Sequence, residues 1–295
     1  MRVFLTGATG FIGSRIIPEL IAAGHQITGL ARSDISAKIL EALGAEVYRG
    51  TLDNPESLRN GAARADAVIH TAFDHDFTNF VANCEKDRRV IRILGDALKG
   101  SDRPLLITSG VGMGDAGEGQ PATEQVFKPE NINPRVASEL EGARLLEEGV
   151  DVRVVRLPQV HDTRRQGLIS SWVEIARQKG AVAYVDEGAN RWSAAHVSDV
   201  AKLYVLVLNK GEKGKRYHAV AEEGVPARAI ALAVSERLSL PLVSLTSEDA
   251  AAYFGWFALF SEMDLIASSA WTQSQLGWKP VGPGLIDDLA NMRVE

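Results

Sequence analysis

Apolar residues along this chain follow two alternating patterns. Short, nearly continuous apolar runs are separated by longer segments in which apolar residues recur at helical spacing. The runs predict strands at 2–6, 25–32, 46–50, 66–72, 104–109 and 151–157. The longer segments predict helices at 11–24, 34–44, 55–61, 78–99 and 134–148, the last capped by Asn133. Strands that are apolar on both faces and alternate with helices predict an α/β fold with a doubly wound parallel sheet.

The pattern changes after about residue 158. Helices are predicted near 167–179, 198–209, 226–237, 247–260 and 283–292, with short strands at 181–185 and 216–220. We therefore predict that 1–160 forms the main part of one domain and that 161–295 forms mostly a smaller, α-rich C-terminal lobe that binds the substrate. The loop 110–133 is too long for a simple connection, and loops of that size are usually functional or mobile.

A glycine-rich turn joins the first predicted strand to the first predicted helix, with the sequence TGATGFIG over 6–13. Gly7 permits a tight turn, Gly10 lets the backbone approach a diphosphate, and Gly13 lets the helix pack closely on the strand. The N-terminus of the helix adds N–H donors and the positive end of its dipole. This strand–turn–helix arrangement predicts a Rossmann-type dinucleotide-binding domain.

The end of the second predicted strand bears on the choice of cofactor. An acid at this place typically accepts the ribose hydroxyl of NAD, but the sequence here is GLARSD, with Arg32 and Ser33. A guanidinium and a hydroxyl suit the extra phosphate of NADP(H), so NADP(H) is predicted over NAD(H). Asp34 follows two positions late and is predicted to cap the next helix.

Charge and cysteine content exclude several classes of partner. The net charge is −6 and there is no basic run, which argues against nucleic acid or an anionic membrane surface. The single cysteine, Cys84, cannot form an internal disulfide and fits a reducing compartment. The N-terminus lacks an apolar signal segment and no run is long enough to span a bilayer, so a cytoplasmic location is expected. We assign no metal site.

Four segments carry a family resemblance. TGATGFIG, VIHTAF, LLITSG and VVRLPQVH, in this order and spacing, resemble the short-chain dehydrogenase/reductase superfamily. The length and the second lobe resemble its extended branch, which includes nucleotide-sugar epimerases and dehydratases. The resemblance implies cofactor contacts at Thr6, Gly7, Thr9, Gly10, Phe11, Ile12, Gly13, Thr51, Leu52, His70, Thr71, Ala72, Phe73, Leu157, Pro158 and Val160. It also implies that Ser109 hydrogen-bonds the substrate oxygen.

The remaining catalytic machinery of that superfamily is missing from the sequence. The resemblance implies a Tyr and a Lys four residues apart on the helix after the fifth strand, yet no Tyr lies between Tyr48 and Tyr184 and no Lys between Lys128 and Lys179. Arg135 is the cation near the expected Lys, and it suits ribose binding better than proton transfer. The Asn that the superfamily carries in the fourth helix corresponds to Asp87. The chain therefore resembles an atypical member with a degenerate catalytic tetrad.

Other residues are candidates for the lost proton donor. His75, in the turn after the fourth strand, can act as a general acid near neutral pH. His161, Tyr184 and His196 are alternatives from the region after the sixth strand. The aromatic segment 251–263 is either helix packing or the wall of an apolar substrate site.

Three functions remain open. The first is an NADPH-dependent carbonyl reductase of a small or apolar molecule, with Ser109, Asp87, His75 and Arg135 in the site. The second is a nucleotide-sugar epimerase or dehydratase, by analogy of fold. The third is a non-catalytic regulator that senses NADPH. A small-molecule substrate is the expected partner, and a homodimer through the fourth and fifth helices is possible.

Overall fold

The central sheet is the feature that positions the site, and it is described here from a computed structural model covering residues 1–294. Seven parallel strands form it in the order β10-β6-β5-β4-β1-β2-β3. Their bounds in that order are Arg216–His218, Asp151–Leu157, Pro104–Gly110, Ala67–His70, Arg2–Thr6, Gln26–Ala31 and Glu46–Arg49. The predicted doubly wound α/β fold is confirmed.

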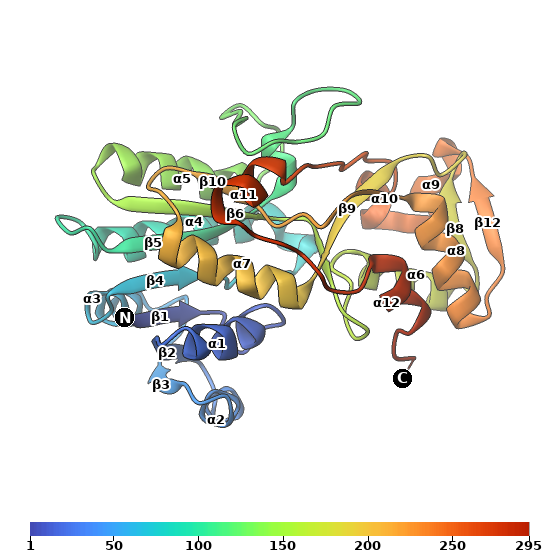
Figure 1. Cartoon of the computed structure of the whole chain (residues 1–295). Coiled ribbons are helices and arrows are strands. Elements are labelled where there is room, and N and C mark those ends of the chain that lie inside the picture. Colours follow the sequence, from blue (N-terminus) through green and yellow to red (C-terminus); the bar gives the residue numbers. More distant parts are fainter. Residues whose placement is uncertain (295) are drawn as a thin grey trace.

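Helices cover both faces of this sheet (Figure 1). One face packs under α1 (Gly13–Ala22), α2 (Asp34–Ala42) and α7 (Val197–Lys210), and the other under α3 (Pro55–Ala63), α4 (Phe80–Asp96) and α5 (Val136–Glu147). Each face has its own buried apolar cluster, as expected for strands that are apolar throughout. Because the seven strands are parallel, their carboxyl ends all lie at one edge of the sheet, and α/β proteins bind ligands at this edge.

The second lobe contains more strands than its sequence pattern indicates. β7 (Gln159–His161), β9 (Arg191–His196) and β11 (Glu222–Pro226) form one small sheet, and β8 (Val182–Val185) and β12 (Leu242–Leu245) form another. Only β8 was predicted, because the others are short and mix polar with apolar residues, so their pairing depends on tertiary partners. The helices of the lobe are α6 (Ile169–Lys179), α8 (Ala227–Leu238), α9 (Ser247–Phe254), α10 (Ala258–Ser261) and α12 (Leu285–Ala290).

Two helix predictions differ from the structure in ways that shape the site. The helix predicted over 247–260 is broken at Gly255, whose φ of +55° ends α9 and starts the short helix η3 (Gly255–Phe257). The helix predicted from Pro134 begins two residues later, at Val136, with Arg135 rather than Asn133 at the cap. The Asn133 side chain instead accepts a hydrogen bond from the Arg135 N–H, which forms a turn before the helix.

The loop 110–133 is anchored within the fold. It begins with the short helix η2 (Val111–Gly114), and carbonyls of Met113, Thr123 and Val126 all accept hydrogen bonds from the buried Arg156 guanidinium. Along residues 1–294, no helix combines the length and the apolar character needed to cross a membrane.

Candidate functional site

The glycine turn has the geometry that a bound dinucleotide needs. Gly7 has φ +70°, and a Cβ there would lie 2.6 Å from the Ala72 nitrogen. A Cβ on Gly13 would lie 2.2 Å from the Gly7 carbonyl oxygen, so α1 can begin only if this residue is glycine. The turn residues Thr9, Gly10 and Phe11 line an open cavity of about 230 Å³. These residues therefore fit a cofactor diphosphate at the start of α1.

The end of β2 is organised differently from the prediction for Asp34. Ser33, not Asp34, is the cap of α2: its hydroxyl accepts a hydrogen bond from the Ser36 N–H at 3.2 Å. Asp34 pairs instead with Arg49, at 2.5 Å. The Ser33 hydroxyl, which also donates to the Ser36 hydroxyl at 3.1 Å, can cap the helix because Ser33 is extended, with φ −141°. Arg32 is exposed beside it.

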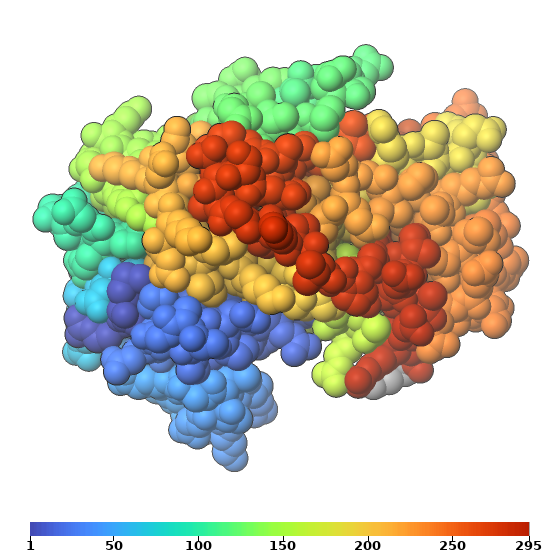
Figure 2. Space-filling view, viewed as in Figure 1, coloured from blue at the N-terminus to red at the C-terminus, as the bar shows by residue number. Residues whose placement is uncertain are grey.

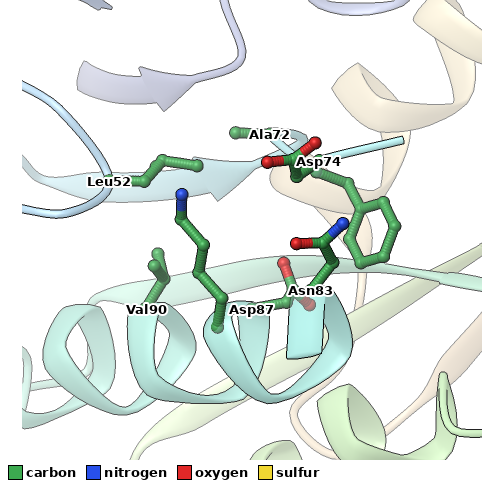
Figure 3. Close-up of a pocket in the computed structure, with 8 residues that line it drawn as sticks. Leu52, Ala72, Asp74, Asn83, Asp87 and Val90 are labelled. Carbon is green, nitrogen blue, oxygen red and sulfur yellow. The ribbon is translucent and has the colours of Figure 1, made fainter. Parts of the chain in front are cut away.

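A small hollow of about 10 Å³, room for about one water, lies where β4 leaves the sheet. Figure 3 shows Asn83 and Asp87 on α4 at one side of the hollow. Leu52, Ala72 and Asp74 lie at the other side. Leu52, Ala72 and Phe73, three of the predicted cofactor residues, are therefore brought together. Thr51 lies beside them, and its carbonyl accepts a hydrogen bond from the Ser57 hydroxyl.

A buried network connects Asp87 to Arg135. Asp87 Oδ2 lies 2.6 Å from Arg135 Nη1 and accepts a hydrogen bond from the Ser138 hydroxyl at 2.5 Å. Its Oδ1 lies 2.9 Å from His70 Nε2. Burial alone raises the pKa of Asp87, but the Arg135 charge, with His70 and Ser138, holds it below its usual range. Asp87 is thus an anion, and its ion pair with Arg135 holds that guanidinium in place. The Asp87 side chain is only 3% exposed.

Arg135 retains hydrogen-bonding capacity after these contacts. Its Nη1 contacts Asp87 and Ser138, its Nη2 donates to the Thr108 carbonyl at 2.8 Å, and its guanidinium lies 4.2 Å above the Phe73 ring. A guanidinium has five N–H groups, so two of them have no partner among the described residues. Arg135 is 14% exposed, so its side chain is not fully enclosed by the protein.

Two predicted cofactor residues turn their side chains into the protein. Thr6 and His70 are buried, and the Thr6 hydroxyl lies 2.6 Å from His70 Nδ1. Both side chains are used to connect β1, β4 and α4, so the backbone is the part of these two residues that is left to face a cofactor. Thr71 donates its hydroxyl hydrogen to the Thr6 carbonyl, which fixes the backbone under the turn.

Ser109 lies near the end of β5 and is 4% exposed. Its hydroxyl is buried and has no hydrogen-bond partner within residues 1–294. A buried polar group without a partner costs free energy unless a water or ligand satisfies it. Its neighbour Thr108 holds Arg135 through the main chain, so the serine and the arginine lie at the same edge.

His75, the predicted proton donor, lies in an aromatic cluster. Its ring contacts Phe73 at 5.2 Å and Phe77 at 6.3 Å between centroids. Burial by these neighbours, and then the charge of Arg135, lower the pKa of His75 below the ordinary histidine value. A lowered pKa means that less of the protonated ring, the form that a general acid requires, is present near neutral pH.

The remaining candidates are distributed over the junction with the second lobe. Leu157 and Pro158 are half-buried and Val160 is buried where β6 passes into β7, behind the edge that carries Ser109. His161 is buried and lies 2.6 Å from Asp288, and His196 caps α7. These two histidines, and Tyr184 on β8, are used within the second lobe and are not brought to Arg135.

Sequence reasoning missed Glu139, which lies four residues after Arg135. Glu139 is buried and accepts hydrogen bonds from Arg156 at 2.8 Å twice and from Arg216 at 2.8 Å. Burial raises the pKa of Glu139, but these two arginines lower it below its ordinary value. The spacing in the sequence could have indicated Glu139, because residues four positions apart lie on the same face of a helix, and Glu139 is four residues after Arg135.

Comparison with known proteins identifies the family. Residues 3–220 match the NAD dependent epimerase/dehydratase family. The chain belongs to this family. Its members are NAD(P)-dependent oxidoreductases and epimerases, so the predicted superfamily and nucleotide binding are confirmed.

The similar proteins range from one without a described activity to two whose names state an activity. The chain is 41% identical to an uncharacterized protein of Schizosaccharomyces pombe, over 99% of both chains. It is 26% identical to the 4-hydroxy-2-methyl-3-oxo-4-farnesyl-3,4-dihydroquinoline-1-oxide ketoreductase of Stigmatella aurantiaca, over 74% of this chain and 67% of that one. Its fold resembles the Thermus thermophilus UDP-glucose 4-epimerase complex with NAD, with TM-score 0.76 and 20% identity over 99% and 97% of the two chains.

Proposed function

We propose that this protein is an NADPH-dependent carbonyl reductase that acts on an apolar ketone or aldehyde. The observation that supports it most is a continuous aromatic surface that begins at Arg135. From Phe73 the ring contacts pass through Phe80 and Phe77 to Trp256 in the second lobe. Phe77 and Trp256 stack at 5.1 Å and 9°, and Trp256 is still 46% exposed. A bulky apolar substrate matches such a surface.

The residues at the sheet edge support carbonyl reduction. When bound, the nicotinamide supplies the hydride. The two open N–H groups of Arg135 hold the carbonyl oxygen and stabilise the negative charge that develops on it. Arg135 keeps its own protons because its pKa is too high to release one. The Ser109 hydroxyl gives the proton to the oxygen and takes another from water, so a ketone becomes an alcohol.

The relatives add support to the substrate class. By its name, the Stigmatella aurantiaca protein is a ketoreductase of a compound that combines a 3-oxo group with an apolar farnesyl chain. NADPH is proposed over NADH because the end of β2 carries Arg32 and Ser33, and a guanidinium and a hydroxyl suit a ribose phosphate.

The test is consumption of NADPH over a panel of aldehydes, aromatic ketones, diketones and quinones, with UDP-sugars beside them. Ser109→Ala is compared with wild type, and Ser193→Ala is the matched control, because Ser193 is another buried hydroxyl without a partner among the described residues but lies in β9. We expect turnover to fall at least about tenfold in Ser109→Ala only.

Two other outcomes would contradict the reductase. Interconversion of UDP-sugars with bound NAD(H) and no net redox change would favour an epimerase, as the fold of the Thermus thermophilus protein allows. Tight NADPH binding without turnover on any compound would favour the sensor.

A further inference from the structure

A second group of cations faces the glycine turn from across the cavity of about 230 Å³. The side of the main domain is formed by the turn and the start of α1. The other side is formed by the loop after β7, which contributes Asp162, Arg164 and Arg165. In Figure 2 this loop, in yellow-green, lies below the second lobe and is separated by a hollow from the blue segment that contains the turn.

Hydrogen bonds fix the backbone of this loop and leave its arginine side chains free. Asp162 Oδ1 accepts the N–H of Arg164 at 2.6 Å and of Arg165 at 3.0 Å. The Asp162 N–H donates to the Arg165 carbonyl at 2.8 Å, and Arg293 N–H donates to the Thr163 carbonyl at 2.8 Å. Both arginines are exposed, so their guanidiniums extend from a rigid support.

The charges around this cavity do not balance without a ligand. Arg15, which also lines it, pairs with Asp162 at 3.4 Å. Neither Arg164 nor Arg165 has an ion-pair partner within residues 1–294. Three arginines and one carboxylate leave a local charge of about +2 in a chain whose net charge is −6. Such a cluster beside a helix N-terminus favours an anion with about two charges, such as a diphosphate.

We propose that Arg164 and Arg165 bind the diphosphate of the dinucleotide from the second lobe, opposite the glycine turn. The cofactor would then be held between the two lobes, with the α1 N-terminus on one side and two guanidiniums on the other. NADH and NADPH carry the same diphosphate, so the clamp does not distinguish them, whereas Arg32 does. The proposal rests on cofactor binding at the glycine turn and not on reductase activity.

The experiment is titration of the full chain with NADPH and with NADH, followed by nicotinamide fluorescence. For the double variant Arg164→Ala/Arg165→Ala we expect the Kd of both cofactors to rise by the same factor, at least about tenfold. For Arg32→Ala we expect the Kd of NADPH alone to rise. The charge-matched control is Arg177→Ala/Lys179→Ala, because both residues are exposed on α6 in the same lobe. It should leave both Kd values within about twofold of wild type.

Several results would overturn the clamp. Unchanged Kd values in the arginine double variant, a rise for NADPH alone, or an equal rise in the α6 control each contradict it. Arg164→Lys/Arg165→Lys, which retains the charge, should recover part of the affinity and guards against misfolding of the alanine variant. If wild type binds neither cofactor, the clamp fails outright. If it binds both but reduces no carbonyl, the reductase fails while the clamp is still decided by the Kd values.

Discussion

Two arginine–carboxylate pairs meet at the beginning of α5 and differ in what they leave unsatisfied. Arg156 and Glu139 are both fully buried, with 0% of either side chain exposed. Arg156 donates to both Glu139 oxygens and to the carbonyls of Met113, Thr123 and Val126. Its five N–H groups are therefore all used, and the pair anchors the loop 110–133.

In the other pair, Arg135 with Asp87, three of the five N–H groups of the arginine have partners among the described residues. Arg135 is 14% exposed, and among residues 1–294 two of its N–H groups have no partner and neither has the hydroxyl of Ser109, which follows Thr108 in β5. A saturated ion pair fixes structure, and an unsaturated one at a sheet edge is ready for a ligand. The two pairs are alike in charge and both are largely buried. They differ in the number of N–H groups that lack a partner, and this difference distinguishes the candidate site pair, Arg135–Asp87, from the structural pair, Arg156–Glu139.

The largest effect is expected on the saturated pair. Glu139→Ala leaves Arg156 buried without its carboxylate, so the free energy of unfolding should fall by about 3–5 kcal/mol. Urea unfolding measures this, with Glu147→Ala as the control because Glu147 is exposed on the same helix. A loss below about 1 kcal/mol would show that the Arg156 cluster is not the anchor we describe.

A smaller effect on stability but a large one on turnover is expected at the unsaturated pair. Arg135→Ala should lower kcat/KM for carbonyl reduction about 100-fold, because the donors at the developing oxyanion are lost. Arg135→Lys should keep the fold, since it retains a partner for Asp87, but should recover little activity because it lacks the planar fork. Full activity in either variant would exclude Arg135 from catalysis.

Acid should weaken the saturated cluster through His218. This residue is buried against Arg156, and burial first and Arg156 second lower its pKa to about 3. Below about pH 6.5 His218 is protonated in the unfolded chain but stays neutral in the folded chain. The contribution of His218 to the free energy of unfolding is therefore fully present above that pH and falls as the pH decreases toward 3.

The size of this loss follows from the same shift. Between pH 7 and pH 5 the contribution of His218 to the free energy of unfolding should fall by about 2 kcal/mol. His218→Asn should show a shallower pH dependence than wild type in urea unfolding at the two pH values. Parallel curves for the two proteins would mean that His218 is not held neutral.

The smallest effect is expected where the aromatic surface reaches the second lobe. Trp256→Ala removes the stack on Phe77, which is worth about 0.5–1.5 kcal/mol. KM for a bulky apolar ketone should rise a few-fold, and KM for a small aldehyde should not change. Trp256→Phe, which keeps an aromatic ring, is the control. Equal changes for both substrates would argue against this surface as the substrate wall.

The sequence was most informative where one local rule was sufficient. Gly7 and Gly13 are where a Cβ would collide with neighbouring backbone, and the strand pattern predicted six of the seven strands of the main sheet in the main domain. The seventh, β10, was predicted as a strand but in the second lobe, because its pairing with β6 is not visible in the sequence. Arg135 and Asp87 were both named, yet their contact depends on the turn before α5 and could not be seen from spacing. Glu139 was missed because a charged residue on a helix usually faces water, and only the fold supplies its two arginines.

The last strand of the main sheet makes its assembly depend on most of the chain. β10 pairs in parallel with β6, and the whole segment from 158 to 215 lies between them. During synthesis on a ribosome, the edge of β6 therefore stays unpaired until the segment 158–215 and β10 itself have emerged. A fragment cut at residue 160 would keep the glycine turn but expose that edge, so it should aggregate rather than form a minimal nucleotide-binding unit.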